Sequence, residues 1–236
     1  MPTTDLSLPL PNGRSLAAAV AVPDGPGPHP GVLVLHEAFG LNGDIRRIAG
    51  RFADEGYVAL APDLYSGGNR LRCLSALLLG PIQKESLALV EAARRSLADR
   101  DDTDERRIAV IGFCMGGGFA LAFGARGGVK AASVNYGAVQ KDRSTYEGVC
   151  PVVAGYGGKD KLFTKQAHRL EDHLEALGVP HDVKVYPDVG HSFMSYDNGP
   201  AWMLKIPSPL HAGYSEPEAD DNWKRILDFF AEHVRA

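Results

Sequence analysis

Residues 108–117 read Ile-Ala-Val-Ile-Gly-Phe-Cys-Met-Gly-Gly, an apolar run that meets a glycine, a cysteine and two further glycines. This pattern is typical of a buried strand that turns sharply into a helix and holds the residue at the turn, here Cys114, in a strained conformation. Only small residues two positions before and after Cys114 leave room for the turn, and Gly112 and Gly116 stand there. The pattern therefore predicts a nucleophile elbow that raises the Cys114 side chain above a sheet.

The helix N-terminus at such a turn favours the thiolate form of Cys114, because free N–H groups and the helix dipole face the sulfur. Two other interpretations fit the same residues: a buried core cysteine beside a glycine-rich turn, and a phosphate-binding loop. The phosphate loop is disfavoured because the chain has neither Gly-Lys-Ser/Thr nor an in-frame GxGxxG motif here. The choice between the remaining two depends on which partners Cys114 has elsewhere in the chain.

Five other short apolar runs punctuate the sequence, at 32–35, 58–62, 131–136, 152–156 and 183–186. Unbroken apolar strands of this length are buried on both faces, as in a parallel sheet covered by helices. Between them, apolar residues recur at helical spacing over 45–52, 89–97 and 167–177, and Gly178 follows the last of these as a helix stop. Alternating strands and helices predict an α/β fold with a mostly parallel central sheet and helices on both faces.

The two ends of the chain carry local signals of their own. Residues 1–22 alternate loosely and turn at Asn12-Gly13, a dipeptide suited to positive φ at both central positions of a hairpin. Near the other end, Ser215 and Glu218 have the spacing of a capping box. They precede the apolar stripe of a helix, formed by Trp223, Ile226, Leu227, Phe230 and Val234. We expect a single domain over residues 1–236.

Composition narrows the classes of function. The chain has 236 residues, 44% of them hydrophobic, and a formal net charge of −4, which is ordinary globular composition. The near-balanced charge argues against a nucleic-acid or anionic-membrane binder. Three cysteines are too few for a disulfide framework or a four-ligand zinc site. With no secretory signal and no run of 18 apolar residues, a cytoplasmic protein without a membrane span is expected.

Reactive side chains follow three of the predicted strands. Cys114, Asp160 and His191 each stand just past the end of an apolar run, where open α/β sheets collect their functional groups. The order nucleophile, acid, histidine is that of α/β-hydrolases. His191 would accept the Cys114 proton, and Asp160 would hold the imidazole in the tautomer that can do so. Taken singly, Asp160 also fits a turn residue and His191 a loop histidine.

With these residues in view, the chain resembles the dienelactone hydrolase family. The resemblance rests on Gly-x-Cys-x-Gly-Gly at 112–117, on the Gly-Lys-Asp loop ending at Asp160 and on Gly-His-Ser-Phe at 190–193. It also rests on Leu-His-Glu at 35–37, followed by Phe-Gly-Leu-Asn at 39–42. It runs from about Gly31 to the C-terminal helix. The resemblance implies an α/β-hydrolase fold and a catalytic triad of the three residues named above.

Glu37 gains a specific role from the resemblance. The family implies that Glu37 contacts the resting thiol and helps to convert it to thiolate when substrate binds. It also implies an oxyanion hole made by the backbone N–H groups of Ala38 and Met115. From the residues alone, Glu37 equally fits a surface glutamate or a salt bridge to Arg46 or Arg47.

The pattern departs from the family at the substrate site. The member that gives the family its name reads a substrate carboxylate with two arginines, and Gly67 and Ser195 stand at the matching positions here. This argues against an anionic dienelactone as substrate. Residues 195–214 are expected to form a wall or lid of an apolar pocket, or else a packed connection. The candidate substrate-binding residues are Arg70, Arg72, Phe39, Tyr136, Phe193 and Trp202.

The predicted function is hydrolysis of a small ester or lactone through a cysteine nucleophile. No metal or organic cofactor is expected, since neither HExxH nor a Rossmann fingerprint is present. The alternatives are a broad carboxylesterase or thioesterase, a redox-active thiol with Cys73 or Cys150 as resolving partner, and an inactive binding module. The expected partner is the small substrate alone, with no nucleic acid or membrane, and the chain is expected as a monomer or small homo-oligomer.

Overall fold

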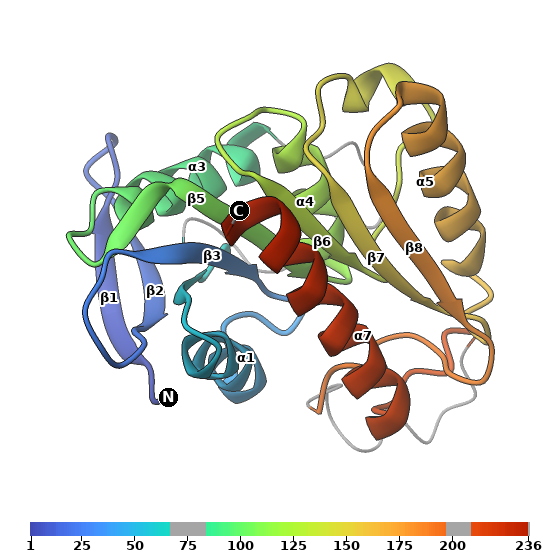
Figure 1. Cartoon of the computed structure of the whole chain (residues 1–236), viewed down its shortest axis with the longest axis horizontal. Helices are drawn as coiled ribbons and strands as arrows, with labels where there is room; N and C mark the ends of the chain where they lie inside the picture. Colours follow the sequence, from blue (N-terminus) through green and yellow to red (C-terminus); the bar gives the residue numbers. More distant parts are fainter. Residues whose placement is uncertain (67–83, 197–208, 236) are drawn as a thin grey trace.

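The computed structural model describes residues 1–66, 84–196 and 209–235, and its centre is one eight-stranded sheet (Figure 1). The strand order is β1-β2-β4-β3-β5-β6-β7-β8. From β4 through β8 neighbouring strands are parallel, whereas β1, β2 and β4 pair antiparallel. The strands are β1 (Thr4–Pro9), β2 (Ser15–Ala21), β3 (His29–Leu35), β4 (Val58–Pro62), β5 (Thr103–Phe113), β6 (Ala131–Asn135), β7 (Val152–Gly157) and β8 (His181–Tyr186).

Helices cover both faces of this sheet. The helices are α1 (Gly43–Asp54), α3 (Lys84–Ala98), α4 (Met115–Gly124), α5 (Thr164–Leu177) and α7 (Glu216–Phe230), which continues into a π-helical turn, Ala231–Arg235. In Figure 1, α7 crosses in front of the sheet with α1 beside it, and α3 and α4 lie behind. Phe52 of α1 packs on Trp223 and Phe230 of α7, with ring centroids 4.6 and 6.2 Å apart. The two front helices therefore share one apolar seam.

The apolar runs and helical stripes of the sequence account for these elements. All five residues of β4 and all five of β6 are buried, because helices cover both sides of the sheet. Every residue of α4 is buried as well, so this helix is apolar all round rather than amphipathic. Gly178 ends α5 in the left-handed region at φ 66°, and its N–H donates to the carbonyls of Leu174 and Glu175.

The hairpin of β1 and β2 differs in detail from the predicted turn. Only Gly13 takes a positive φ, of 76°, whereas the sequence predicted positive φ at Asn12 as well. Asn12 instead accepts a hydrogen bond from the Arg14 N–H through its side-chain oxygen, at 3.1 Å. This side-chain turn lets a five-residue loop replace the two-residue turn that Asn-Gly usually forms.

The start of α7 also corrects a prediction. Ser215 precedes the first helical residue, but its side chain makes no hydrogen bond to a helix N–H. Its hydroxyl donates instead to the Glu218 carboxylate at 2.5 Å, and the Ser215 N–H donates to the Phe193 carbonyl at 3.0 Å rather than to Glu218. The capping box is therefore wrong. The apolar stripe is buried at Trp223, Ile226, Phe230 and Val234, whereas Leu227 is only partly buried.

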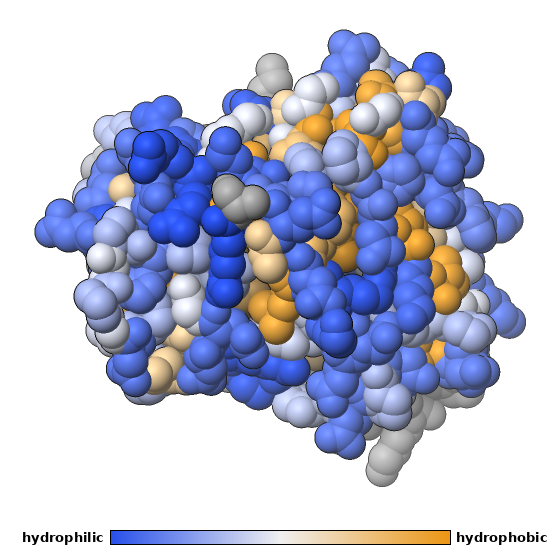
Figure 2. All heavy atoms as spheres, in the orientation of Figure 1, coloured by the Kyte–Doolittle hydropathy of each residue, from blue (hydrophilic) through white to orange (hydrophobic). Residues whose placement is uncertain are grey.

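The outer surface over α1 and α7 is mostly hydrophilic, with hydrophobic residues visible in patches between polar ones (Figure 2). Among the described residues, the large hydrophobic side chains that stand exposed are Met1, Leu162 and Tyr196. Within the same residues, no helix has the length and apolar character needed to cross a membrane.

Candidate active site

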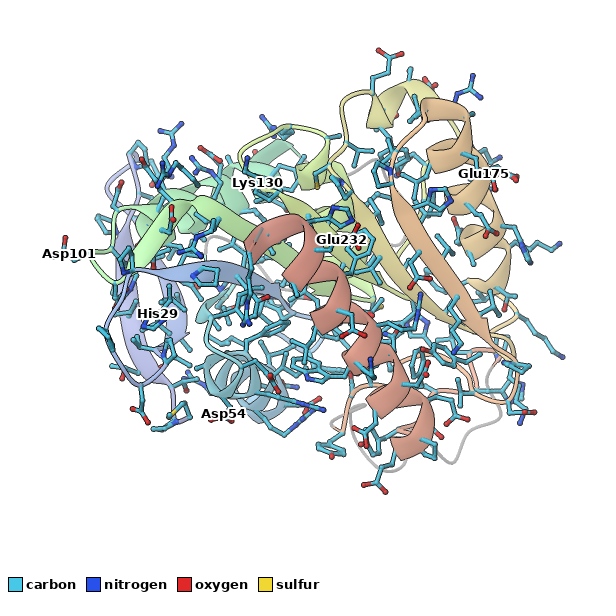
Figure 3. All side chains as sticks on the ribbon, in the orientation of Figure 1. His29, Asp54, Asp101, Lys130, Glu175 and Glu232 are labelled. Atoms are coloured by element: carbon cyan, nitrogen blue, oxygen red, sulfur yellow. The ribbon has the colours of Figure 1, made fainter. Side chains whose placement is uncertain are left out.

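The parallel strands bring four reactive side chains to one edge of the sheet. Glu37 follows β3, Cys114 follows β5, Asp160 follows β7, and His191 stands in the connection after β8. The carboxyl ends of parallel neighbours lie at the same edge, so residues far apart in sequence meet there. His29, by contrast, lies at the amino end of β3, one strand length away from this edge (Figure 3).

Cys114 has the strained backbone that its sequence pattern predicts. It adopts φ 51° and ψ −110°, in a region that non-glycine residues rarely occupy. Its N–H donates to the Asn135 carbonyl of β6 at 2.9 Å, which anchors the turn to the next strand. A Cβ on Gly112 would collide with the Gly116 carbonyl, and one on Gly116 with the Leu35 carbonyl. The two glycines are therefore required by the close approach of backbone segments.

Asp160 and His191 form a buried pair. The Asp160 Oδ2 and the His191 Nδ1 lie 2.6 Å apart, and Asp160 is fully buried. The other carboxylate oxygen accepts the N–H groups of Leu162 and Phe163 at 3.0 and 3.1 Å. Because a carboxylate only accepts, the Nδ1 of His191 carries a proton, and Nε2 is the nitrogen left for the thiol.

The His191 ring is held on both sides. It packs between Tyr136 and Phe163, with ring centroids 4.9 and 4.7 Å away. The backbone N–H of His191 donates to the Leu210 carbonyl at 2.8 Å, and its carbonyl accepts from Gly213 at 3.1 Å. Aromatic packing and backbone bonds together fix the imidazole in the direction that Asp160 sets.

The charge state of His191 follows from its neighbours. Burial alone lowers the pKa of the imidazole, but the hydrogen bond to Asp160 and the interaction with Cys114 raise it, to about 10 overall. A histidine with a raised pKa next to a thiol stabilises the thiolate–imidazolium pair. Cys114 is half-buried, so its sulfur is not sealed in the core.

Glu37 is buried, and its side chain is surrounded by hydroxyl groups. Its Oε1 accepts from the Ser195 hydroxyl at 2.5 Å and from the Tyr136 hydroxyl at 3.1 Å, and the Ser192 hydroxyl lies 3.4 Å from Oε2. Burial raises the pKa of the Glu37 carboxyl, while Ser195, the His191 charge and Tyr136 lower it to a smaller extent. Among the described residues, the hydrogen bonds of this carboxyl thus go to hydroxyl groups.

Glu37 is neither a surface glutamate nor the salt-bridge partner of Arg46 or Arg47. Glu37 is 5% exposed, which excludes a surface glutamate. Arg46 pairs with Asp5 at 2.6 Å, and Arg47 pairs with Asp44 at 2.7 Å, so both arginines have other carboxylate partners. The remaining role of Glu37 is one inside the site.

The comparison with known proteins identifies the family. A sequence model of the dienelactone hydrolase family matches residues 16–234. The chain belongs to the dienelactone hydrolase family. It is therefore a hydrolase of the carboxylic-ester class, as the resemblance implied.

Individual relatives agree with this family. A protein of Salmonella typhimurium, named as a candidate carboxymethylenebutenolidase, is 32% identical over 222 residues, which cover 86% of this chain and 77% of the relative. A protein of Yersinia pestis with the same name is 30% identical over 240 residues, covering 94% of this chain and 85% of the relative.

Solved structures of dienelactone hydrolases share the fold. A candidate dienelactone hydrolase from Klebsiella pneumoniae superposes with a TM-score of 0.79 at 28% identity, covering 98% of both chains. A dienelactone hydrolase-like phosphotriesterase from metagenomic libraries, at 22% identity, superposes with a TM-score of 0.83 over 99% of both chains. The α/β-hydrolase fold predicted from the sequence is confirmed.

The segments that carry the expected oxyanion hole lie side by side. Met115 is the first residue of α4, where backbone N–H groups lack partners within the helix. Tyr65 joins the two segments, because its hydroxyl donates to the Ala38 carbonyl at 3.0 Å and lies 3.6 Å from the Met115 sulfur. Sequence reasoning did not select Tyr65, which closes the Pro-Asp-Leu-Tyr stretch at 62–65, directly after the apolar run 58–62.

The expected substrate-binding residues fall into two groups. Tyr136 and Phe193 are fully buried, their rings pack together at 5.6 Å, and the Tyr136 ring also lies 4.9 Å from the His191 ring. Phe39 is half-buried. The others, Arg70, Arg72 and Trp202, lie outside the described residues, as do Gly67, Cys73 and most of the expected loop 195–214.

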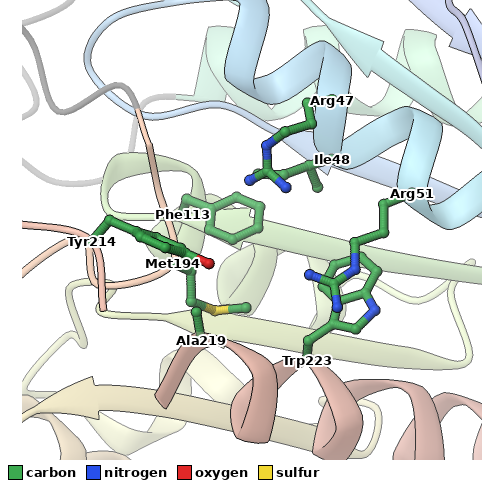
Figure 4. Close-up of a pocket in the computed structure, with 8 residues that line it drawn as sticks. All are labelled: Arg47, Ile48, Arg51, Phe113, Met194, Tyr214, Ala219 and Trp223. Carbon is green, nitrogen blue, oxygen red and sulfur yellow. The ribbon is translucent and has the colours of Figure 1, made fainter. Parts of the chain in front are cut away.

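A small pocket lies between α1 and α7 (Figure 4). Its lining residues are Arg47, Ile48, Arg51, Phe113, Met194, Tyr214, Ala219 and Trp223. Arg51 lies over the Trp223 ring at 4.3 Å, and its guanidinium is 3.5 Å from the Asp220 carboxylate. The pocket is thus lined by side chains already engaged with one another.

Proposed function

We propose that this chain hydrolyses small, uncharged esters or lactones through Cys114, with His191 as general acid and base and Asp160 as the residue that orients His191. The observation that carries the proposal is the 2.6 Å contact between Asp160 and His191, next to a cysteine at φ 51°. A nucleophile, a base and a group that orients the base are the parts that nucleophilic catalysis requires.

The proposed reaction has two stages. The Cys114 thiolate attacks the carbonyl carbon of the substrate, and the carbonyl electron pair moves onto oxygen, where the N–H groups of Ala38 and Met115 would stabilise it. As the tetrahedral intermediate collapses, the bond to the leaving alcohol breaks and His191 donates its Nε2 proton to that oxygen. The product of this stage is a thioester on Cys114.

Water completes the cycle. His191, now neutral at Nε2, accepts a proton from a water molecule that attacks the thioester carbonyl. Collapse of the second intermediate breaks the carbon–sulfur bond and releases the carboxylic acid, and Cys114 returns as thiolate beside a protonated His191. The proton gained from water in this stage balances the one given to the alcohol in the first.

An uncharged substrate is proposed because of Ser195. The member that gives the family its name has an arginine here that binds the carboxylate of its substrate. This chain has the buried Ser195 instead, whose hydroxyl donates a hydrogen bond to Glu37. A serine hydroxyl supplies one hydrogen bond and no positive charge, so it cannot offset the desolvation of an anionic substrate. Neutral lactones and short esters avoid that cost.

The decisive experiment measures hydrolysis of short p-nitrophenyl esters, neutral lactones, an anionic dienelactone and a thioester by wild type, Cys114→Ala and Cys150→Ala. Cys150 is the matched control, because it is a half-buried cysteine whose thiol has its pKa raised to about 12 by burial. We expect turnover of neutral esters or lactones that is lost in Cys114→Ala and kept in Cys150→Ala. Preference for the thioester would instead identify a thioesterase.

Two results would overturn the proposal. Equal turnover in wild type and Cys114→Ala would remove the cysteine from the reaction. Absence of turnover on every substrate, combined with rapid alkylation and reversible oxidation of Cys114, would favour the redox-active thiol. Cytoplasmic location, and a monomer or small homo-oligomer, are further parts of the proposal that cell fractionation and sedimentation velocity would test.

A further inference from the structure

Three buried oxygen atoms meet in a ring beside the proposed triad. The Glu37 Oε1 lies 2.5 Å from the Ser195 Oγ and 3.1 Å from the Tyr136 Oη, and these two hydroxyl oxygens are 3.0 Å apart. All three residues are buried, and they come from the end of β3, the end of β6 and the connection after β8. Each side of this triangle is short enough for a hydrogen bond.

Counting protons shows which charge state fits the ring. Three hydrogen bonds need three protons, and the hydroxyls of Tyr136 and Ser195 supply one each. An ionised Glu37 supplies none, so one side of the triangle would be a contact between lone pairs. A protonated Glu37 supplies the third proton, and each oxygen can then donate once and accept once around the ring.

The surroundings of Glu37 also favour the uncharged form. Burial is the largest influence and raises the pKa of the carboxyl, and the nearby Asp44 carboxylate raises it further. The hydroxyl of Ser195, the charge of His191 and the hydroxyl of Tyr136 act in the opposite direction.

Tyr136 has a strained backbone conformation. Its backbone lies in the left-handed region at φ 43°, which is unusual for an aromatic residue, and its N–H donates to the Gly155 carbonyl at 2.8 Å. Strained residues of this kind concentrate where geometry serves function. The strain places the phenol so that its hydroxyl reaches Glu37 and Ser195.

We propose that Glu37 carries its proton at neutral pH, and that Tyr136 and Ser195 are positioning residues that close a ring of hydrogen bonds around that proton. The ring directs the carboxyl toward the hydroxyls and adds no negative charge beside Cys114 and His191. Protonation of Glu37 stands independently of the proposed function; only its effect on the thiol rests on that function.

The pH dependence follows from the groups that face Glu37. These are His191 in the site, Tyr136 at the end of β6, which itself interacts with Cys114, and Asp44 at the start of α1, whose charge Arg47 balances at 2.7 Å. Because the pKa of Glu37 is raised, its proton leaves at a higher pH than that of an ordinary glutamate. The charge that then forms faces the thiol–imidazole pair and changes its reactivity.

Infrared difference spectroscopy tests the protonation directly. Wild type minus Glu37→Gln at neutral pH is expected to show the carbonyl band of a carboxylic acid, which moves on transfer to heavy water. Tyr136→Phe and Ser195→Ala are expected to shift that band, whereas Tyr146→Phe, which removes another buried hydroxyl, is expected to leave it unchanged. A carboxylate band in place of the acid band would overturn the proposal.

The rate of Cys114 alkylation by iodoacetamide, measured against pH, tests the positioning role. Wild type is expected to show an additional step that Glu37→Gln lacks. Loss of the Ser195 hydroxyl in Ser195→Ala is expected to move the step upward by about one to two pH units, the size of one lost hydrogen bond to a charged group. Ser195→Thr is expected to restore it.

The outcomes separate the two proposals. An unmoved step in Ser195→Ala would remove Ser195 from its positioning role. Retained ester hydrolysis in Cys114→Ala would end the proposed function, yet the infrared band of Glu37 does not depend on turnover and would still report its proton.

Discussion

The hydrogen bond between the Asp160 carboxylate and His191 decides which nitrogen of the imidazole carries a proton. Two backbone N–H groups, from Leu162 and Phe163, occupy one oxygen of the carboxylate and leave the other for His191. The carboxylate therefore cannot rotate without losing hydrogen bonds in a buried site. The proposed chemistry therefore depends on the tautomer of the His191 imidazole as much as on its distance from Asp160.

Asp160→Asn tests that dependence. The amide would donate to Nδ1 and push the imidazole proton to Nε2, where a base is needed, so kcat is expected to fall roughly 10²- to 10⁴-fold, by analogy with serine triads. The matched control is Asp172→Asn, an exposed aspartate on α5, which is expected to keep full activity. Steady-state kinetics, with circular dichroism to check folding, give the result. Nearly full activity in Asp160→Asn would exclude Asp160 as the orienting residue.

The turn from β5 into α4 illustrates the scale of the element. Here the strand, the helix and β3 approach so closely that backbone atoms contact one another, and side chains beyond hydrogen cannot fit. The same crowding fixes Cys114 at φ 51°, because the chain has no other route into the helix. The glycines at 112 and 116 therefore permit this turn, and the packing of β3 against it leaves no room for a larger residue at 116.

Gly116→Ala is expected to destabilise the protein by roughly 2–4 kcal/mol, because its Cβ would collide with the Leu35 carbonyl. Gly43→Ala serves as control, since a Cβ there meets no atom within 4 Å. Urea unfolding followed by circular dichroism measures both. Equal stability in the two variants would show that the elbow tolerates a side chain and that the close approach is not needed.

At the scale of the molecule, several polar contacts join α7 to the sheet. Arg225 donates to the Asp182 side chain of β8 at 2.9 Å and to its carbonyl at 3.0 Å. It also donates to Asn222 at 2.8 Å, and Asn222 in turn donates to Asn135 of β6 at 2.8 Å. These bonds hold the C-terminal helix against β6 and β8, the strands on either side of β7, which precedes Asp160.

Arg225→Lys is expected to lower the free energy of unfolding by roughly 1–3 kcal/mol, because an ammonium group cannot reproduce the several directed bonds of the guanidinium. Arg106→Lys is the matched control, since Arg106 is exposed and its ion pair with Asp104 is long, at 3.5 Å. Chemical denaturation of both variants gives the comparison. A loss in Arg225→Lys no larger than in the control would mean that apolar packing alone holds α7 in place.

Much of this protein was predictable from local patterns. Apolar runs located the parallel strands, helical spacing located α1, α3, α5 and α7, and the glycines around Cys114 predicted its strained turn. Each of these depends on residues close in sequence, where steric exclusion and periodic burial act directly. Where two local hydrogen-bonding patterns are possible, the sequence predicted the wrong one, namely a capping box at Ser215 and a positive φ at Asn12.

The partners of Glu37 were beyond such reasoning. Ser195 and Tyr136 reach it from 158 and 99 positions away in the chain. Nothing in the local sequence of a serine or a tyrosine indicates that a distant carboxyl will lie within a hydrogen bond of it. The sheet and its connections decide which oxygens meet, because burial then forces every polar atom to find a partner among the few that folding has brought near. The sequence determined which residue types are present, and the tertiary contacts decided which hydroxyl groups surround the Glu37 carboxyl.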